Sequence, residues 1–224
     1  MITVHHLNNS RSQRVLWLLE ELAVPYEIKK YERDATTMLA PESLRKVHPL
    51  GKSPVITDGA VTVAESGAIV EYLVDRHGQG RLVPAAGTPE RLRYTYWLHF
   101  AEGSAMPPLL MKLIFDKVAS APMPFFVKPI ARGISAKVMS AFVSPNLTRQ
   151  LDFMEAELAK SAWFAGDAFS AADIQMSFPL EAAAQRAGLN ASRPRLMAFL
   201  KKIHARPAYA RALERGGPYS FAND

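Results

Sequence analysis

Glu65 and Ser66 stand at the point where a helix is predicted to begin. The helix is predicted from the helical spacing of the apolar residues at 69, 70, 73 and 74. Ser66 is expected to be its N-cap residue, with unpaired backbone N–H groups and the positive end of the helix dipole beside it. Such a position can bind a carboxylate, and a plain helix cap without a ligand is the alternative.

A second polar motif, His48-Pro-Leu-Gly-Lys-Ser-Pro54, precedes these residues. Two short β-branched runs separated by Asp58-Gly59 lie between the two motifs. Asp-Gly accepts the positive φ values of a type I′ turn, so these runs are predicted to form a β-hairpin. The hairpin leads directly into the helix at Glu65.

In their order and spacing, the two motifs resemble the glutathione-binding half of glutathione transferases. The resemblance implies a cis peptide bond between Ser53 and Pro54, whose backbone pairs with the cysteinyl part of glutathione. It also implies that Glu65 binds the γ-glutamyl ammonium and that Ser66 binds the α-carboxylate. Lys52 is expected to pair with the glycyl carboxylate, and a solvated lysine is the alternative.

Glutathione transfer requires a thiolate, whereas a free thiol has a pKa of about 8.5. Hydrogen bonding or positive potential must favour the anion, and the loop before the first helix offers Asn9, Ser10 and Ser12 as donors. Ser10 lies four residues before Arg14, which matches the catalytic residue of the theta-like and beta-like classes. The resemblance therefore favours Ser10, with Asn9 or Ser12 as alternatives and plain helix capping as a third. Arg11 either raises the local positive potential or faces solvent, and Arg14 is expected to form a structural ion pair.

The first third of the chain is predicted to alternate between strands and helices, with the connectivity βαβ-α-ββα of an α/β thioredoxin-like domain. The first helix has one apolar face and is expected to end near Ala23, because Pro25 restricts the residue before it. The other predicted elements are strands over Ile2–Leu7 and Tyr26–Tyr31, a short helix over Pro41–Val47 with proline at its first position, and the hairpin with its helix.

The rest of the chain is predicted to be an all-helical domain. The proposed boundaries are 1–81 for the first domain, 82–87 for a linker and 88–224 for the helical domain. Thr88-Pro89 is expected to open a long helix that Pro107-Pro108 kinks or divides. The later predicted elements are helices over about Asn146–Lys160, Ala172–Ala187 and Pro194–Arg206, and a terminal turn after Pro207.

Ser170 and Asp173 form a Ser-x-x-Asp capping pair ahead of an apolar run. On physical grounds the pair is structural, and it is similar to the capping box of the helical domain in glutathione transferases. Several segments of the helical half resemble the yeast membrane-associated glutathione transferase and its bacterial relatives. That subgroup implies a homodimer that uses glutathione against electrophiles or peroxides, in a detoxification role. The residues expected to line the apolar electrophile site are Met106, Leu110, Met123 and Phe126.

Composition excludes several other classes of protein. The 224-residue chain has no cysteine, so disulfides, Cys-based metal sites and a thiol of its own are excluded. Its net charge of +6 is spread along the chain, without the concentrated basic face of a nucleic-acid binder. No apolar run is long enough to span a bilayer, no signal peptide is evident, and the histidines lack metal-ligand spacing. The chain is therefore expected to be cytoplasmic, with no metal, nucleic acid or membrane span.

The predicted function is transfer of the glutathione thiolate to a hydrophobic electrophile. A glutathione-dependent peroxidase or disulfide-bond reductase that uses the same site is the first alternative. A non-catalytic binding module with the same fold is the second.

Overall fold

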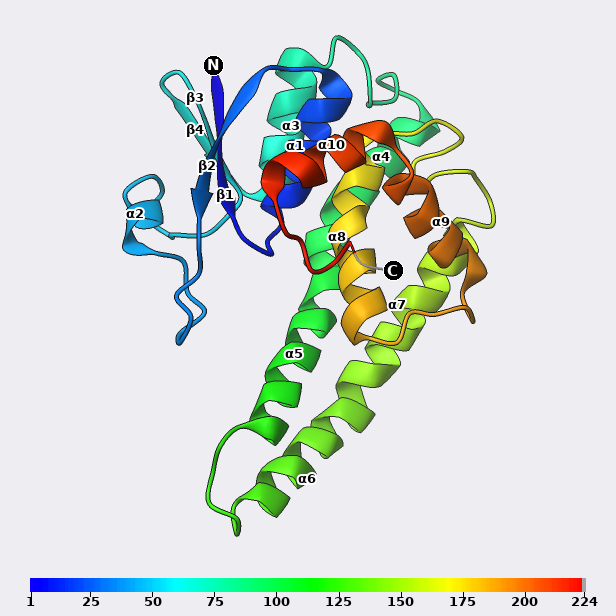
Figure 1. Ribbon diagram of the computed structural model, residues 1–224. Helices are drawn as coiled ribbons and strands as arrows, with labels where there is room; N and C mark the ends of the chain where they lie inside the picture. Colours follow the sequence, from blue (N-terminus) through cyan, green and yellow to red (C-terminus); the bar gives the residue numbers. More distant parts are fainter. Residues whose placement is uncertain (223–224) are drawn as a thin grey trace.

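A four-stranded sheet with the strand order β2-β1-β3-β4 organises the first third of the chain (Figure 1). It belongs to a computed structural model that describes residues 1–222. β1 pairs with β2 in parallel and with β3 antiparallel, and β3 pairs with β4 antiparallel. The elements of this part are β1 (Ile2–Leu7), α1 (Ser12–Leu22), β2 (Tyr26–Tyr31), α2 (Glu42–Arg45), β3 (Val55–Asp58), β4 (Val61–Ala64) and α3 (Ser66–His77).

The alternation of side chains along β1 separates two apolar layers. Ile2 and Val4 belong to the main core together with residues of α1 and α3. Leu7 instead packs with Tyr31 and Leu44 in a smaller cluster. The predicted strands and the end of α1 at Ala23, which adopts the left-handed conformation, are confirmed.

Three local predictions in this part are corrected by the structure. Glu65, and not Ser66, is the N-cap of α3, and Ser66 is the first helical residue. Pro41 is the N-cap of α2 and so precedes its first helical position. In the β3–β4 turn only Gly59 has a positive φ (59°), which corresponds to a type II′ turn instead of type I′, because type I′ needs two positive φ values.

The second part of the chain is helical, and a long helix pair projects from the rest of the molecule (Figure 1). Thr88 caps α4 by accepting from the Arg91 N–H, with proline at the first helical position, as predicted. The elements are α4 (Pro89–Phe100), η1 (Ala101–Ala105), α5 (Met106–Ser120), α6 (Lys128–Val138), η2 (Met139–Val143), α7 (Ser144–Glu157), α8 (Ala171–Arg186), α9 (Pro194–His204) and α10 (Pro207–Gly216).

Two π-helical turns let long helices continue past proline residues. η1 ends two residues before Pro107, and η2 ends two residues before Pro145. A proline inside a helix lacks an N–H and its ring clashes with the carbonyl four residues earlier, whereas the wider π turn leaves room for it. The predicted break at Pro107-Pro108 is therefore a change of helical pitch. The helix predicted to begin at about Asn146 begins earlier, at Ser144, and continues from α6 through η2.

The two parts share one hydrophobic core. Trp17 of α1 is fully buried, and its ring lies edge-on to Tyr209 of α10, with 5.2 Å between centroids. The segment after Pro207 was predicted to be a turn; it is the ten-residue helix α10. Its apolar side packs on α1, and this long-range contact stabilises a helix that is too short to be stable alone. The boundaries at 81 and 88 stay a prediction.

Asp173 anchors the start of α8 as predicted. Its carboxylate accepts from the Ser170 N–H at 2.9 Å and from the Phe164 N–H at 2.9 Å, and it is fully buried. The reciprocal contact from the Ser170 side chain to the Asp173 backbone completes a capping box. The Ala171 N–H donates to the Leu82 carbonyl, so this cap also ties α8 to the connection between the two parts.

Candidate functional site

Three side chains around the β1–α1 loop are connected by hydrogen bonds, from His6 through Ser12 to Ser10. The Ser10 hydroxyl is 2.7 Å from the Ser12 hydroxyl, and the Ser12 hydroxyl is 2.9 Å from His6 Nδ1. The Ser12 N–H also donates to Ser10 Oγ at 3.2 Å. Both serines are buried, and the Ser10 hydroxyl lies 3.4 Å from Ser53 Oγ. Of the two serines in the loop, Ser10 is therefore the one nearer to the cis-proline loop.

Asn9 has a different set of partners. Its φ is 48°, in the left-handed region that asparagine tolerates. Its side-chain oxygen accepts from the Ser220 N–H at 2.8 Å, which ties the β1–α1 loop to the C-terminal segment. This contact gives Asn9 a structural role that the sequence did not indicate.

A cleft of about 210 Å³ lies between the first part of the chain and η1. Its wall contains the cis Ser53-Pro54 peptide, which confirms the predicted cis bond. The Ser53 hydroxyl donates to the His5 carbonyl at 3.1 Å and thereby attaches this loop to β1. The residues that line the cleft are Arg11, His48, Leu50, Lys52, Ser53, Pro54, Ala64, Glu65, Ser66 and Glu102.

The start of α3 forms one end of the cleft. Glu65 has a φ of 71°, a rare conformation for a residue other than glycine and one that occurs often at binding sites. The Glu65 side chain makes no capping hydrogen bond and the first turn of α3 contains no acidic residue, so no side chain takes up the N–H groups at the positive end of its dipole. Ser66 begins this helix and lines the cleft, so its end of the cleft suits a carboxylate.

Charges of both signs surround the cleft. Glu102 of η1 lies 3.1 Å from Arg11 Nε and also pairs with the buried Arg14. Burial opposes ionisation of Glu102, but Arg14 and Arg11 outweigh it and hold the pKa of this carboxyl below its usual range. The expected structural ion pair of Arg14 is confirmed. Lys52 is exposed at the cleft and forms no ion pair within residues 1–222, so its charge is available to an anionic ligand.

Both parts of the chain match family models. Residues 1–75 match "Glutathione S-transferase, N-terminal domain", and residues 115–207 match "Glutathione S-transferase, C-terminal domain". The chain belongs to the glutathione S-transferase family.

Individual relatives agree with this assignment. The transferase is 38% identical to Glutathione S-transferase 3 of Schizosaccharomyces pombe, with 96% of this chain and 88% of the relative covered. It is 36% identical to Glutathione S-transferase 1 of Saccharomyces cerevisiae, with 96% and 95% covered. The crystal structure of a glutathione S-transferase from Actinobacillus pleuropneumoniae superimposes with a TM-score of 0.80 at 30% identity, with 100% and 97% covered.

The predicted glutathione-binding residues of the transferase are brought together by the fold. They come from α1, the cis-proline loop and the start of α3, and all of them line the one cleft: Arg11, Lys52, Ser53, Pro54, Glu65 and Ser66. Ser10 adjoins this set through Ser53, whereas Asn9 does not line the cleft.

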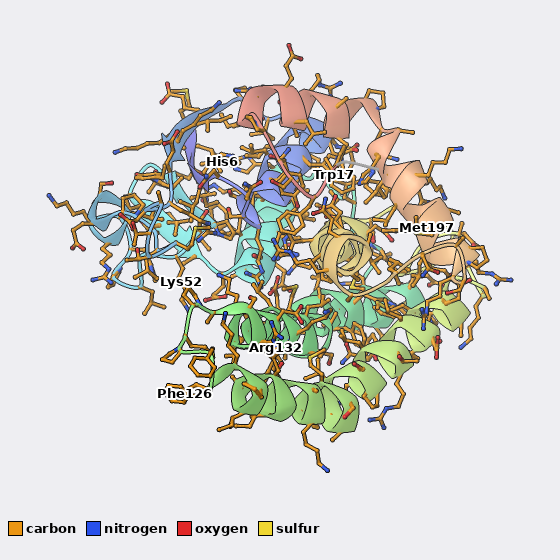
Figure 2. The ribbon with its side chains drawn as sticks, turned by 60° about the horizontal axis from the view of Figure 1, so that its bottom comes forward. His6, Trp17, Lys52, Phe126, Arg132 and Met197 are labelled. Atoms are coloured by element: carbon orange, nitrogen blue, oxygen red, sulfur yellow. The ribbon has the colours of Figure 1, made fainter. Side chains whose placement is uncertain are left out.

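The residues predicted to bind the electrophile lie outside that cleft. Met106 is half-buried against the main core, and Met123 is half-buried in the α5–α6 turn. Leu110 is 52% exposed and Phe126 is 65% exposed. Figure 2 shows Phe126 at the outer end of the α5–α6 pair, away from His6. The four predicted residues therefore lie on α5 or in the α5–α6 turn, and none of them lines this cleft.

Glu102 and His48 line the cleft but were not among the predicted site residues. A signal for Glu102 was present, because two arginines three positions apart at the start of α1 require a carboxylate partner when one of them is buried. His48 opens the cis-proline motif but was considered only as a metal ligand. No group of His, Asp and Glu within residues 1–222 could hold a metal ion, and no helix there is long and apolar enough to cross a bilayer.

Proposed function

We propose that the protein conjugates the thiolate of glutathione to hydrophobic electrophiles. The observation that supports this proposal is the cleft. It is lined by the N-terminus of α3, the Glu65 carboxylate and Lys52, and the Ser10 hydroxyl lies beside it, next to Ser53. In the proposed complex the α-carboxylate of glutathione lies on Ser66 and its ammonium on Glu65. The glycyl carboxylate lies on Lys52, and Ser53 pairs with the cysteinyl backbone. The sulfur then lies next to Ser10.

The chemistry at the sulfur follows from its neighbours. The Ser10 hydroxyl donates a hydrogen bond to the sulfur, and the start of α1 and Arg11 supply positive potential, so the thiol loses its proton to water near neutral pH. The thiolate electron pair forms a C–S bond with the electrophilic carbon, and the leaving group departs with the electrons of the broken bond. Binding both ends of the tripeptide holds the sulfur in place for this attack.

The electrophile is proposed to enter beside the helical part of the chain. Met106, Leu110, Met123 and Phe126 stay the proposed apolar contacts, supported by the exposed apolar surface of α5 and the α5–α6 turn. Cytoplasmic location and a detoxification role stay predictions.

Calorimetry with glutathione tests the binding half of the proposal. Glu65→Gln keeps the shape of the side chain but removes the charge that faces the ammonium. We expect its Kd for glutathione to rise about tenfold, since a hydrogen bond between charged groups contributes about 1.5–3 kcal/mol. Glu71→Gln removes the same charge from the exposed side of α3 and serves as the matched control, with an unchanged Kd. Absence of glutathione binding by the unmodified protein would contradict the proposal.

Turnover assays then separate conjugation from the alternative activities. An aryl halide, cumene hydroperoxide and a glutathione mixed disulfide are compared at equal glutathione concentration. Highest kcat/KM with the aryl halide supports conjugation. Highest kcat/KM with the peroxide or the disulfide assigns the same site to peroxidase or reductase chemistry, and binding without any turnover assigns it to a binding module.

A homodimer is part of the proposal. Apolar side chains are exposed along the first helices of the helical part, which is unusual for a monomer because such patches mark interaction surfaces. They are Leu92, Tyr96, Ile114, Ile130 and Ile134. Sedimentation equilibrium is expected to give twice the 24.8 kDa mass of one chain, and the mass of a single chain would contradict this.

A further inference from the structure

His6 is a buried titratable residue for which the proposed function provides no role. It lies on β1, is 5% exposed and contacts the Ser12 hydroxyl through Nδ1 at 2.9 Å. The neighbouring His5 bonds to Tyr31 instead, so only His6 joins the serines of the β1–α1 loop. The chain from His6 through Ser12 to Ser10 ends at the proposed position of the sulfur.

The number of hydroxyl protons in this series of hydrogen bonds decides whether Ser10 can donate to the sulfur. A serine hydroxyl has one proton to donate. Ser53 uses its proton on the His5 carbonyl, so it cannot donate to Ser10. Ser10 Oγ accepts from the Ser12 N–H at 3.2 Å and shares a 2.7 Å contact with Ser12 Oγ. The direction of that short contact decides whether Ser10 keeps its proton for the sulfur.

His6 determines this direction through the proton on Nδ1. If Nδ1 carries no proton, Ser12 donates to His6, and Ser10 must then donate its own proton to Ser12. If Nδ1 carries the proton, it donates to Ser12 Oγ, and Ser12 then donates to Ser10 at 2.7 Å in preference to the Leu7 carbonyl at 3.4 Å, because the shorter contact is the stronger one. Only in the second arrangement is the Ser10 proton free to point at the sulfur.

His6 acts by setting the direction of the hydrogen bond between Ser12 and Ser10, and not through a charge on its imidazole. Burial, aided by the positive charge of Lys30, lowers the pKa of His6 to about 4. Lys30 lies opposite His6 in the β1–β2 register, and Arg11 is the charged residue of the β1–α1 loop. His6 is therefore neutral over the pH range in which the glutathione thiol titrates, and it can donate from one ring nitrogen only.

We propose that His6, with its proton on Nδ1, is a positioning residue that orients the Ser12 and Ser10 hydroxyls so that Ser10 donates to the glutathione sulfur. The inference rests on the proposed function, because it concerns how the same thiolate is stabilised. Its effect is on the acidity of the bound thiol and not on the affinity for the tripeptide.

The test measures the pKa of bound glutathione from the ultraviolet absorbance of its thiolate. His6→Phe keeps a ring but removes the donor, and we expect it to raise the pKa of the bound thiol by about one unit and lower kcat at pH 7 about tenfold. The Kd for glutathione is expected to stay within about twofold, and kcat is expected to recover at a pH above the raised thiol pKa. Loss of packing alone would not produce that recovery.

Two further variants keep the test decisive. Asparagine can place an amide N–H where Nδ1 stands, so His6→Asn is expected to keep the pKa of the bound thiol close to that of the unmodified protein. Ser12→Ala removes the hydroxyl that competes for the Ser10 proton, so it is expected to keep the thiol pKa close to that of the unmodified protein and to cancel the effect of His6→Phe in the double variant. His99→Phe, on the exposed side of α4, is the control with an unchanged thiol pKa.

The outcomes separate this inference from the proposed function. If the unmodified protein binds glutathione with a lowered thiol pKa and His6→Phe shares that pKa, or if Ser12→Ala raises it as much as His6→Phe does, the His6 inference is wrong and the proposed function stands. Equal effects of His6→Phe and His6→Asn also overturn it, because only Asn retains a donor. If the unmodified protein does not lower the thiol pKa, the proposed function itself fails.

Discussion

Replacing Ser10 by alanine is expected to lower kcat for conjugation about 100-fold. This is the low end of the loss in kcat that follows removal of one hydrogen-bond donor to an anion at an active site. The hydroxyl lies 3.4 Å from Ser53 at the edge of the glutathione cleft, and no other serine of the β1–α1 loop is as close to that edge. The Kd for glutathione should change little, since both ends of the tripeptide are bound elsewhere. The pKa of the bound thiol should rise toward that of free glutathione.

The measurement is steady-state kinetics together with titration of the bound thiol. Ser10→Thr retains the hydroxyl and is the matched control, with kcat expected within about tenfold of the unmodified protein, since it keeps the donor. An unchanged rate for Ser10→Ala would transfer the role to Asn9 or Ser12. A large loss in Asn9→Ala alone would identify Asn9, although its side-chain oxygen is already bonded to Ser220.

Replacing Asp173 by alanine is expected to lower the free energy of unfolding by about 3 kcal/mol, because two buried N–H groups lose their partner at about 1–3 kcal/mol each. These are the N–H groups of Phe164 and Ser170, each 2.9 Å from the carboxylate. Urea denaturation should show a lower midpoint with an unchanged slope. Asp167→Ala in the same loop is the control: Asp167 is exposed, and its one contact, with the Ala162 N–H, is 3.4 Å long.

The Asp173 carboxyl also predicts a pH dependence of stability. Burial raises its pKa to about 6 despite the hydrogen bonds from Phe164 and Ser170, whereas its ordinary value is 3.8. The folded state therefore binds this proton more tightly than the unfolded state, so its contribution is fully present below pH 3.8 and is lost as the pH rises through 6. Comparing unfolding of the unmodified protein and Asp173→Asn between pH 4 and pH 8 isolates this contribution; parallel curves would contradict it.

The strands and the helix starts could be predicted because their signals are local. Asp58-Gly59 marks a tight turn, Thr88-Pro89 a helix start, and Ser170 with Asp173 a capping box, and each depends on residues within a few positions. The type of the Gly59 turn could not be predicted, since Asp-Gly is compatible with more than one turn. The set of residues that line the cleft could be predicted because a resemblance of motifs places distant residues together without any calculation of packing.

Contacts between distant segments could not be predicted in the same way. α10 is a helix because its apolar side packs on α1, and nothing near Pro207 specifies that partner. The π turns before Pro107 and Pro145 depend on long helices that continue through them, whereas proline alone indicates a break. The electrophile residues were chosen from one helix and the segment that follows it, and the sequence does not say which side of either faces the cleft.

The sequence by itself determined the family, the cis-proline loop and the residue types that line the cleft, because these depend on short motifs whose backbone preferences are local. Only the tertiary structure decided that Glu102 closes the cleft through Arg11 and Arg14, and that His6 stands behind Ser10 and Ser12. Those contacts depend on how a strand, a helix and a π turn pack in three dimensions. A shift of one element by less than the length of a side chain alters which polar groups are in contact.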